Sequence, residues 1–137
     1  MIIERGVLER IFKSCETGYP YEVAGLMLSN SGGRVVEILP VSNVHEDDRR
    51  VRYRVDPMEY YRAEKKAEEL GLQVVGVFHS HPDHPAQPSR YDLEHALPGW
   101  FYLIVSVYGG RVSGYACWLA VENSGGKRFV QEVVSAE

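Results

Sequence analysis

One stretch governs the architecture expected of this chain, and it reads His79-Ser80-His81-Pro82-Asp83-His84-Pro85-Ala86-Gln87-Pro88-Ser89-Arg90-Tyr91-Asp92. It follows an apolar run, residues 73–78, that is rich in β-branched side chains and predicts a strand entering the core. The prolines keep the chain extended and turning after that strand. From residue 89 a polar and apolar pattern predicts a short helix. We therefore expect a strand, a rigid turn and a helix in succession.

Three residues of this stretch have the types and spacing of metal ligands. His79 and His81 are two apart on the predicted strand, so their side chains point to the same face. Ser89 and Asp92 are three apart and lie at neighbouring positions of the first helical turn. Two imidazoles and one carboxylate are the ligands of a catalytic zinc site, whose fourth position holds water. We therefore predict one zinc ion per chain, held by His79, His81 and Asp92, and a zinc hydrolase.

Each of these residues also has a structural interpretation, which stays open. An isolated histidine is more often packed or exposed than a ligand. Serine followed three residues later by aspartate is first of all a helix N-cap, worth about 0.5–2 kcal/mol. The two roles are compatible, because Ser89 can cap the helix that presents Asp92. The combination of paired histidines, a rigid turn and a carboxylate near one point favours the metal site.

The stretch resembles the signature of the JAMM (MPN+) zinc metalloproteases, which is His-x-His-Pro, six residues, then Ser-x-x-Asp. The family also has a glutamate far upstream beside a short apolar strand, and residues 21–28 resemble that segment with Glu22 at the matching place. The similarity extends over nearly the whole chain and is greatest to the small stand-alone bacterial and archaeal members. It implies an α+β, MPN-like fold with a curved, mixed, mostly antiparallel sheet flanked by helices.

The resemblance also implies catalytic roles and a substrate class. Glu22 would be the base that moves a proton from water to the leaving amine. Ser89 would donate a hydrogen bond to the developing oxyanion, a role worth roughly 10²–10³ in rate. The bond cut would be an amide after the C-terminal Gly of a ubiquitin-like or sulfur-carrier protein with a Gly-Gly tail. Spacing alone does not find Glu22, because a glutamate at the mouth of a strand is usually solvated.

Two other functions remain open at this point. A non-catalytic MPN scaffold is one, although such chains lose ligands and this one has all of them. A RadC-like, DNA-related protein has a similar His-x-His-Pro run, but the net charge of −4 and the Glu22 segment count against it.

Cys15 and Cys117 lack the Cys-x-x-Cys spacing of zinc deaminases. We expect both to be buried free thiols rather than a disulfide.

Composition sets the broad class of the chain. Its 137 residues predict one domain, residues 1–137, and 45% hydrophobic with 25% charged residues is ordinary for a globular protein. The acidic balance argues against a nucleic-acid partner, and no apolar run approaches the roughly 20 residues of a membrane span. The first residues lack a signal-peptide layout, so we expect the cytoplasm. The oligomeric state stays open.

Periodicity predicts the remaining elements. Helical spacing indicates an amphipathic helix over about residues 4–17, and Asp56 begins a second that runs to about Leu70. We expect its inner face to hold Tyr60, Ala63, Ala67 and Leu70. Further strands are predicted at residues 23–29, 35–39, 51–55, 100–107, 112–121 and 129–134.

Several polar residues keep more than one interpretation. The basic face of strand 51–55, Arg52 and Arg54, is either a wet sheet surface or a contact for an acidic partner. His84 lies in the turn between the predicted ligands, where we favour a residue without a role in the reaction. His95 is three residues beyond Asp92 and could support the metal ligands from behind. His45 has no assigned role.

Overall fold

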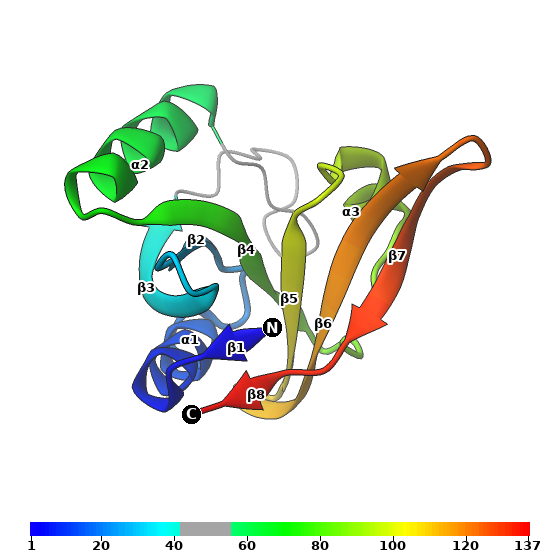
Figure 1. Ribbon diagram of the computed structural model, residues 1–137. Helices are drawn as coiled ribbons and strands as arrows, with labels where there is room; N and C mark the ends of the chain where they lie inside the picture. Colours follow the sequence, from blue (N-terminus) through cyan, green and yellow to red (C-terminus); the bar gives the residue numbers. More distant parts are fainter. Residues whose placement is uncertain (42–55) are drawn as a thin grey trace.

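We describe residues 1–41 and 56–137 in a computed structural model of the protein. These two ranges form a curled sheet with helices on both of its faces (Figure 1). In chain order the elements are β1 (Ile2–Ile3), α1 (Arg5–Gly18), β2 (Ala24–Ser29), β3 (Arg34–Val41), α2 (Pro57–Glu69), β4 (Gln73–Pro82), α3 (Arg90–His95), β5 (Phe101–Tyr108), β6 (Arg111–Asn123), β7 (Gly126–Glu132) and β8 (Ser135–Ala136). Each helix and strand predicted within these ranges is present, with ends shifted by a few residues.

The sheet is mixed, as expected. Its strand order is β7-β6-β5-β4-β2-β3-β1-β8, so β4 lies in the interior between β2 and β5. The long pairings of β2 with β3 and β4, and of β6 with β5 and β7, are antiparallel. β4 with β5 is parallel, and so are the two short pairings of β1. The expected α+β architecture with a curved, mostly antiparallel sheet is confirmed.

Two strands of two residues each, β1 and β8, complete one end of the sheet. β7 and β8 stand at opposite ends of the strand order but are separated by only Val133 and Val134 in sequence. Figure 1 shows the chain passing directly from β7 to β8, which lies beside β1. The N–H of Ser135 donates to the carbonyl of Met1 at 2.9 Å. These short strands were not predicted, because two residues contain no measurable periodicity.

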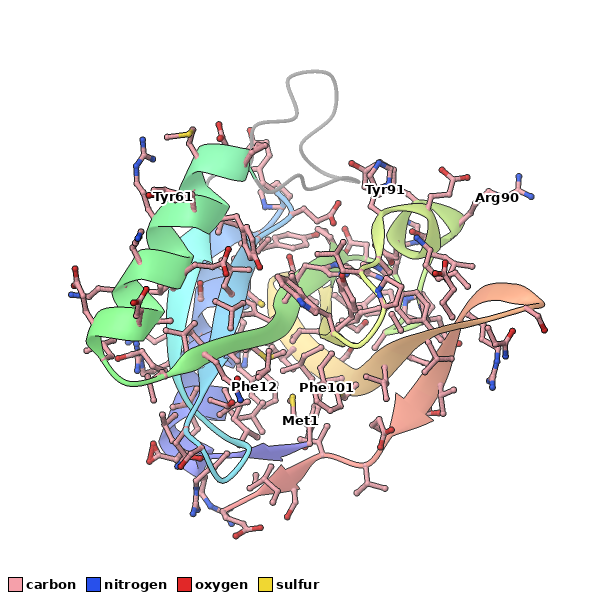
Figure 2. The ribbon with its side chains drawn as sticks, turned by 45° about the horizontal axis from the view of Figure 1, so that its top comes forward. Met1, Phe12, Tyr61, Arg90, Tyr91 and Phe101 are labelled. Carbon is pink, nitrogen blue, oxygen red and sulfur yellow. The ribbon has the colours of Figure 1, made fainter. Side chains whose placement is uncertain are left out.

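The two faces of the sheet bury separate apolar cores. In β4, Phe78 belongs to the core beneath α1, and Val77 belongs to the core beneath α2. Because side chains alternate along a strand, His79 and His81 lie on the α2 face, and Ser80 lies on the α1 face. Figure 2 shows Met1, Phe12 and Phe101 close together on the α1 side, where they pack against the first core. The helices contribute Val7, Leu8, Ile11 and Cys15 from α1, and Ala63 and Ala67 from α2.

α2 begins and ends close to the predicted positions, but one residue of its predicted inner face is exposed. The Asp56 carboxylate accepts the N–H of Met58 at 2.7 Å, with Pro57 as the first helical residue. The prediction that Leu70 faces inward is wrong, because this residue is the C-cap and its side chain is 47% exposed. The predicted strand 51–55, with Arg52 and Arg54, and His45 lie outside the described residues. Among the described helices, none combines the length and apolar content that crossing a membrane requires.

Candidate active site

The end of β4 brings two imidazoles to one side of the sheet. His79 is opposite Ala24 of β2 and Ile104 of β5, and it is completely buried. His81 is partly buried, and its ring centroid lies 5.0 Å from that of His79. Both rings therefore face the same small volume, as their spacing along the strand predicted.

Asp92 reaches this volume from the first turn of α3. One carboxylate oxygen and one ring nitrogen from each histidine lie within 4.8 Å of one another. Oδ1 of Asp92 is 3.4 Å from Nε2 of His79, and Oδ2 is 3.2 Å from Nε2 of His81. Two strand residues and one helix residue thus offer three converging donor atoms.

A capping box at the start of α3 orients Asp92. The Ser89 hydroxyl accepts the N–H of Asp92 at 3.0 Å, and Oδ2 of Asp92 accepts the N–H of Ser89 at 2.8 Å. These bonds hold Oδ2 against the backbone while Oδ1 faces His79. Arg90, between them, points out from the helix away from the sheet (Figure 2). Helix capping and ligand presentation, which the sequence left as compatible interpretations, therefore use the same pair of residues.

A backbone contact sets the orientation of the His81 ring. Its Nδ1 lies 2.9 Å from the carbonyl oxygen of Pro85. A carbonyl oxygen can only accept, so this contact assigns the hydrogen to Nδ1 and leaves a lone pair on Nε2. That lone pair faces the Asp92 carboxylate at 3.2 Å. Two electron-rich atoms this close need a proton or a cation between them, and a metal ion held by an oriented imidazole is one way to meet this need.

Burial and neighbouring groups set the ionisation of two candidate ligands. Burial, the largest influence, lowers the pKa of His79 to about 4 against the opposing effect of Asp92. Burial acts to raise the pKa of Asp92, but His79, His81 and the Ser89 N–H outweigh it and lower that pKa to about 2. A neutral imidazole and a carboxylate are the forms that bind metal. The donor set therefore fits a zinc ion with three protein ligands.

Hydrogen bonds to three successive carbonyl groups anchor the turn between β4 and α3. The Ser106 hydroxyl donates to the carbonyl of His84, and Nε1 of Trp118 donates to that of Ala86 at 3.1 Å. The carbonyl between them, that of Pro85, receives the His81 ring. The turn that joins the ligands is therefore held to β5 and β6 by side chains as well as by its prolines.

Glu22 lies beside the ligand cluster, at the end of the chain segment that enters β2. Its side chain is buried, with 5% of the residue exposed, and its Oε1 is 3.7 Å from Nδ1 of His79. The antiparallel pairing of β2 with β4, in which Ala24 is opposite His79, brings it there. The structure thus places the glutamate indicated by the resemblance next to the residues indicated by spacing.

Glu22, His81 and Ser89 line one pocket of about 310 Å³. A base candidate, a ligand candidate and a hydrogen-bond donor candidate therefore open into the same space. The sequence predicted this rigid turn but not that Gln87 lines the pocket, because the only available signal was the position of that residue between the two halves of the motif. The remaining lining residues are Pro82, His84, Pro85 and Gln87.

Residues away from the pocket also received predictions. His95 is exposed at the end of α3, where its ring stacks on Tyr91 at a centroid distance of 4.1 Å, so it belongs to the helix end rather than to the ligand cluster. Cys15 and Cys117 are buried free thiols, as expected. Burial raises the pKa of each to about 12, so neither thiol is a nucleophile near neutral pH.

The cluster offers three donor atoms beside a further carboxylate, which is the composition of a mononuclear metal site in a hydrolase. Residues 4–120 match the family described as prokaryotic homologs of the JAB domain. The match covers most of the chain, and the chain belongs to this family. The resemblance to small prokaryotic JAMM proteins is thereby confirmed.

Curated relatives and solved structures agree with this assignment. The chain is 41% identical over 92 residues to a desampylase of Haloferax volcanii, which is 66% of each chain. It is 34% identical over 112 residues to a probable TtuB-protein conjugate cleaving protease of Thermus thermophilus, covering 81% of this chain and 73% of that one. A solution structure of a protein from Salinibacter ruber aligns with a TM-score of 0.75 at 34% identity, covering 100% of this chain and 92% of that one.

Proposed function

We propose that this protein is a zinc-dependent isopeptidase or peptidase that hydrolyses an amide bond after the C-terminal Gly of a ubiquitin-like or sulfur-carrier protein. The observation that supports this most directly is the shared pocket of Glu22, His81 and Ser89, because the residues proposed as base, metal ligand and hydrogen-bond donor all line it. The names of the two curated relatives, a desampylase and a conjugate-cleaving protease, point to the same substrate class.

In this proposal one zinc ion is held by His79, His81 and Asp92. When bound, zinc supplies Lewis acidity toward the substrate carbonyl and makes water nucleophilic near neutral pH. His81 keeps its metal-facing lone pair because Pro85 accepts its Nδ1 hydrogen. Asp92 offers Oδ1 while its Oδ2 stays bonded to the Ser89 N–H.

Glu22 moves the proton. Its carboxylate borders the pocket beside His79, so it can accept a proton from the attacking water and deliver it to the departing amine. Burial of the side chain excludes bulk water from that transfer.

Ser89 stabilises the oxyanion. Its oxygen accepts the Asp92 N–H, and this bond leaves the hydroxyl hydrogen available for a substrate oxygen in the pocket. The start of the helix already holds this hydroxyl in place. Little conformational entropy is therefore lost when it donates to the developing charge, which is the preorganisation that an oxyanion donor needs.

The substrate tail is held in extended form by the pocket and its proline-rich rim. β4 is paired on both sides, with β2 and β5, so an incoming strand cannot add to the strand that presents the histidines. The tail must therefore approach from the turn side, past Pro82, Pro85 and Gln87. A tail ending in Gly-Gly suits this approach, because residues without side chains can bring the backbone closest to the metal.

The cellular location, domain organisation and partners of the protein are proposed from its sequence. We place it in the cytoplasm as one domain over residues 1–137, with a protein substrate and no nucleic-acid or membrane partner. A non-catalytic scaffold and a RadC-like DNA-related role are less well supported, since the candidate ligands converge and Glu22 lies against them.

Cleavage of a defined conjugate tests the proposal. Zinc-loaded protein is incubated with a small Gly-Gly-terminated ubiquitin-like protein joined to a lysine side chain or to a single amino acid such as cysteine. We expect release of the free C-terminal carboxylate and the amine, loss of cleavage with chelator, and recovery on adding zinc. Absence of cleavage with every Gly-terminated conjugate, while zinc is fully bound, would reject the substrate class.

A further inference from the structure

Ser80 lies between the two histidine ligand candidates but on the opposite side of β4. It is 1% exposed and shares the α1 face of the sheet with Phe78. It does not line the pocket formed by Glu22, His81 and Ser89. A buried hydroxyl here is therefore not a candidate for contact with the substrate.

Instead, Ser80 bonds twice to the backbone of Val23, the residue after Glu22. The N–H of Ser80 donates to the carbonyl of Val23 at 2.9 Å. The N–H of Val23 donates to the Ser80 hydroxyl oxygen at 2.8 Å. The neighbour of the base candidate is thus fixed through both of its backbone polar groups.

The second bond departs from a regular ladder. Ala24 is opposite His79, so the next pair along these antiparallel strands is Val23 with Ser80. In a regular pair of this kind both bonds join backbone to backbone. Here the hydroxyl replaces the Ser80 carbonyl as acceptor, and β2 begins one residue later, at Ala24. The side chain of Ser80 therefore sets where the strand starts and where the preceding residue turns.

That preceding residue is Glu22, whose Oε1 lies 3.7 Å from Nδ1 of His79. We infer that Ser80 is a positioning residue, whose hydroxyl clamps Val23 and thereby holds the Glu22 carboxylate in place beside the metal ligands. This inference rests on the proposed function, in which Glu22 transfers the proton. The two bonds of Ser80 also join the segment of Glu22 to β4, the strand that presents His79 and His81. The proposed base and two of the proposed ligands are therefore positioned by the same strand.

The cost of losing the clamp follows from the precision that proton transfer needs. A displacement of about 1 Å in a catalytic group can lower the rate by about 10²-fold. Removing the hydroxyl frees the Val23 N–H and lets Glu22 sample other positions, while His81 and Asp92 keep their own hydrogen bonds. The expected result is a lower kcat with nearly unchanged KM and unchanged zinc content.

The test compares three variants at position 80. Ser80→Ala removes the acceptor, and the pair Ser80→Thr and Ser80→Val adds the same bulk with and without a hydroxyl. Ser29→Ala is the matched control, because Ser29 is a buried serine at the other end of the β2–β4 pairing, opposite Gln73. We expect Ser80→Ala and Ser80→Val to lower kcat by about tenfold or more, Ser80→Thr to retain it, and Ser29→Ala to leave it unchanged.

Hydrogen exchange of the Val23 amide supplies a readout that does not depend on turnover. The Val23 amide hydrogen should exchange slowly in wild type, Ser80→Thr and Ser29→Ala. It should exchange rapidly in Ser80→Ala and Ser80→Val. Wild-type kcat in Ser80→Ala would overturn the inference, as would a Thr variant that is protected at Val23 but no more active than the Val variant. Failure of wild-type protein to cleave any conjugate would instead defeat the proposed function, while protection at Val23 would still report the clamp.

Discussion

The N–H of Ser89 donates to Oδ2 of Asp92 at 2.8 Å, and the N–H of Asp92 donates back to the Ser89 hydroxyl at 3.0 Å. This reciprocal pair begins α3 and also borders the candidate metal cluster. In the proposed mechanism the same two side chains contribute to stability and to chemistry, and substitutions at Ser89 can separate the two contributions.

Ser89→Ala and Ser89→Gly should lower turnover alike but differ in stability. Loss of an N-cap serine costs about 1 kcal/mol with alanine and only a few tenths with glycine. Loss of the oxyanion donor should lower kcat by roughly 10²–10³ in both variants. Urea unfolding and steady-state kinetics measure the two effects. A glycine variant with near wild-type kcat would show that Ser89 is only a cap.

Single substitutions of His79, His81 or Asp92 with alanine should remove most of the zinc. Each one deletes a donor from a set of three, and the remaining two cannot complete a tetrahedral site. Zinc content after dialysis against a weak chelator gives the result, with His95→Ala as a control that keeps its metal. Full zinc occupancy in two of the three ligand variants would contradict the assignment.

Glu22→Gln should retain fold and zinc but lose nearly all turnover. The substitution keeps the shape of the side chain and removes its capacity to accept a proton, a function worth roughly 10²–10⁴ in rate. Glu94→Gln, on an exposed residue of α3, is the matched control. Thermal unfolding and zinc analysis establish that the protein is intact. Near-normal kcat in the Glu22 variant would mean that another group is the base.

Metal-free protein should lose stability as the pH falls from about 6.5 to about 4. Burial lowers the pKa of His79 from 6.5 to about 4, so the unfolded chain binds a proton in this range that the folded chain does not. Stability is therefore present above pH 6.5 and declines below it. Asp92 contributes in a lower pH range, because its pKa is lowered from 3.8 to about 2 and its contribution is lost as the pH falls through that range.

Urea unfolding with chelator at pH 7 and pH 4.5 measures the effect of His79. His79→Asn removes the titrating group, so its loss of stability across this range should be smaller by the contribution of one proton. His95→Asn, at an exposed site, should behave as wild type. An equal decline in the His79 variant and in wild type would refute the attribution.

Replacing the penultimate Gly of the substrate tail with Val should slow cleavage strongly. A β-branched residue cannot pass the rim of prolines as closely as glycine, and the pocket of about 310 Å³ leaves it little room. The kcat/KM ratio for the two tails measures the selectivity. Equal cleavage of both tails would contradict the proposal that the approach to the metal is too narrow for a β-branched side chain.

The sequence predicted the convergence of the three candidate ligands better than their surroundings, because these three residues are close in sequence and their surroundings are not. His79, His81 and Asp92 lie within one short stretch, so strand and helix periodicity alone indicated that they converge. Glu22 depends on the pairing of β2 with β4, which no local pattern reports, and only the family resemblance indicated it. The bond from Val23 to Ser80 has no sequence signal at all, because serine beside a ligand has many uses.

The fold shows the same division. Long periodic segments such as α1 and β5 were predicted with nearly correct ends. β1 and β8 were missed because each is two residues long and is defined by its neighbours rather than by its own pattern. Leu70 was expected to be buried from helical spacing, but a residue at the end of a helix extends past the sheet that the spacing assumes it covers.

The pairing of β1 with β8 has a consequence for synthesis of the protein. Ile2 and Ile3 pair with Ser135 and Ala136, which follow much later in the sequence. Such a sequence-distant pairing forms late, since the intervening chain must first be ordered. During translation one edge of β1 therefore stays unpaired until residue 136 has left the ribosome. A nascent chain stalled before that point would display an open, pairing-competent edge on β1.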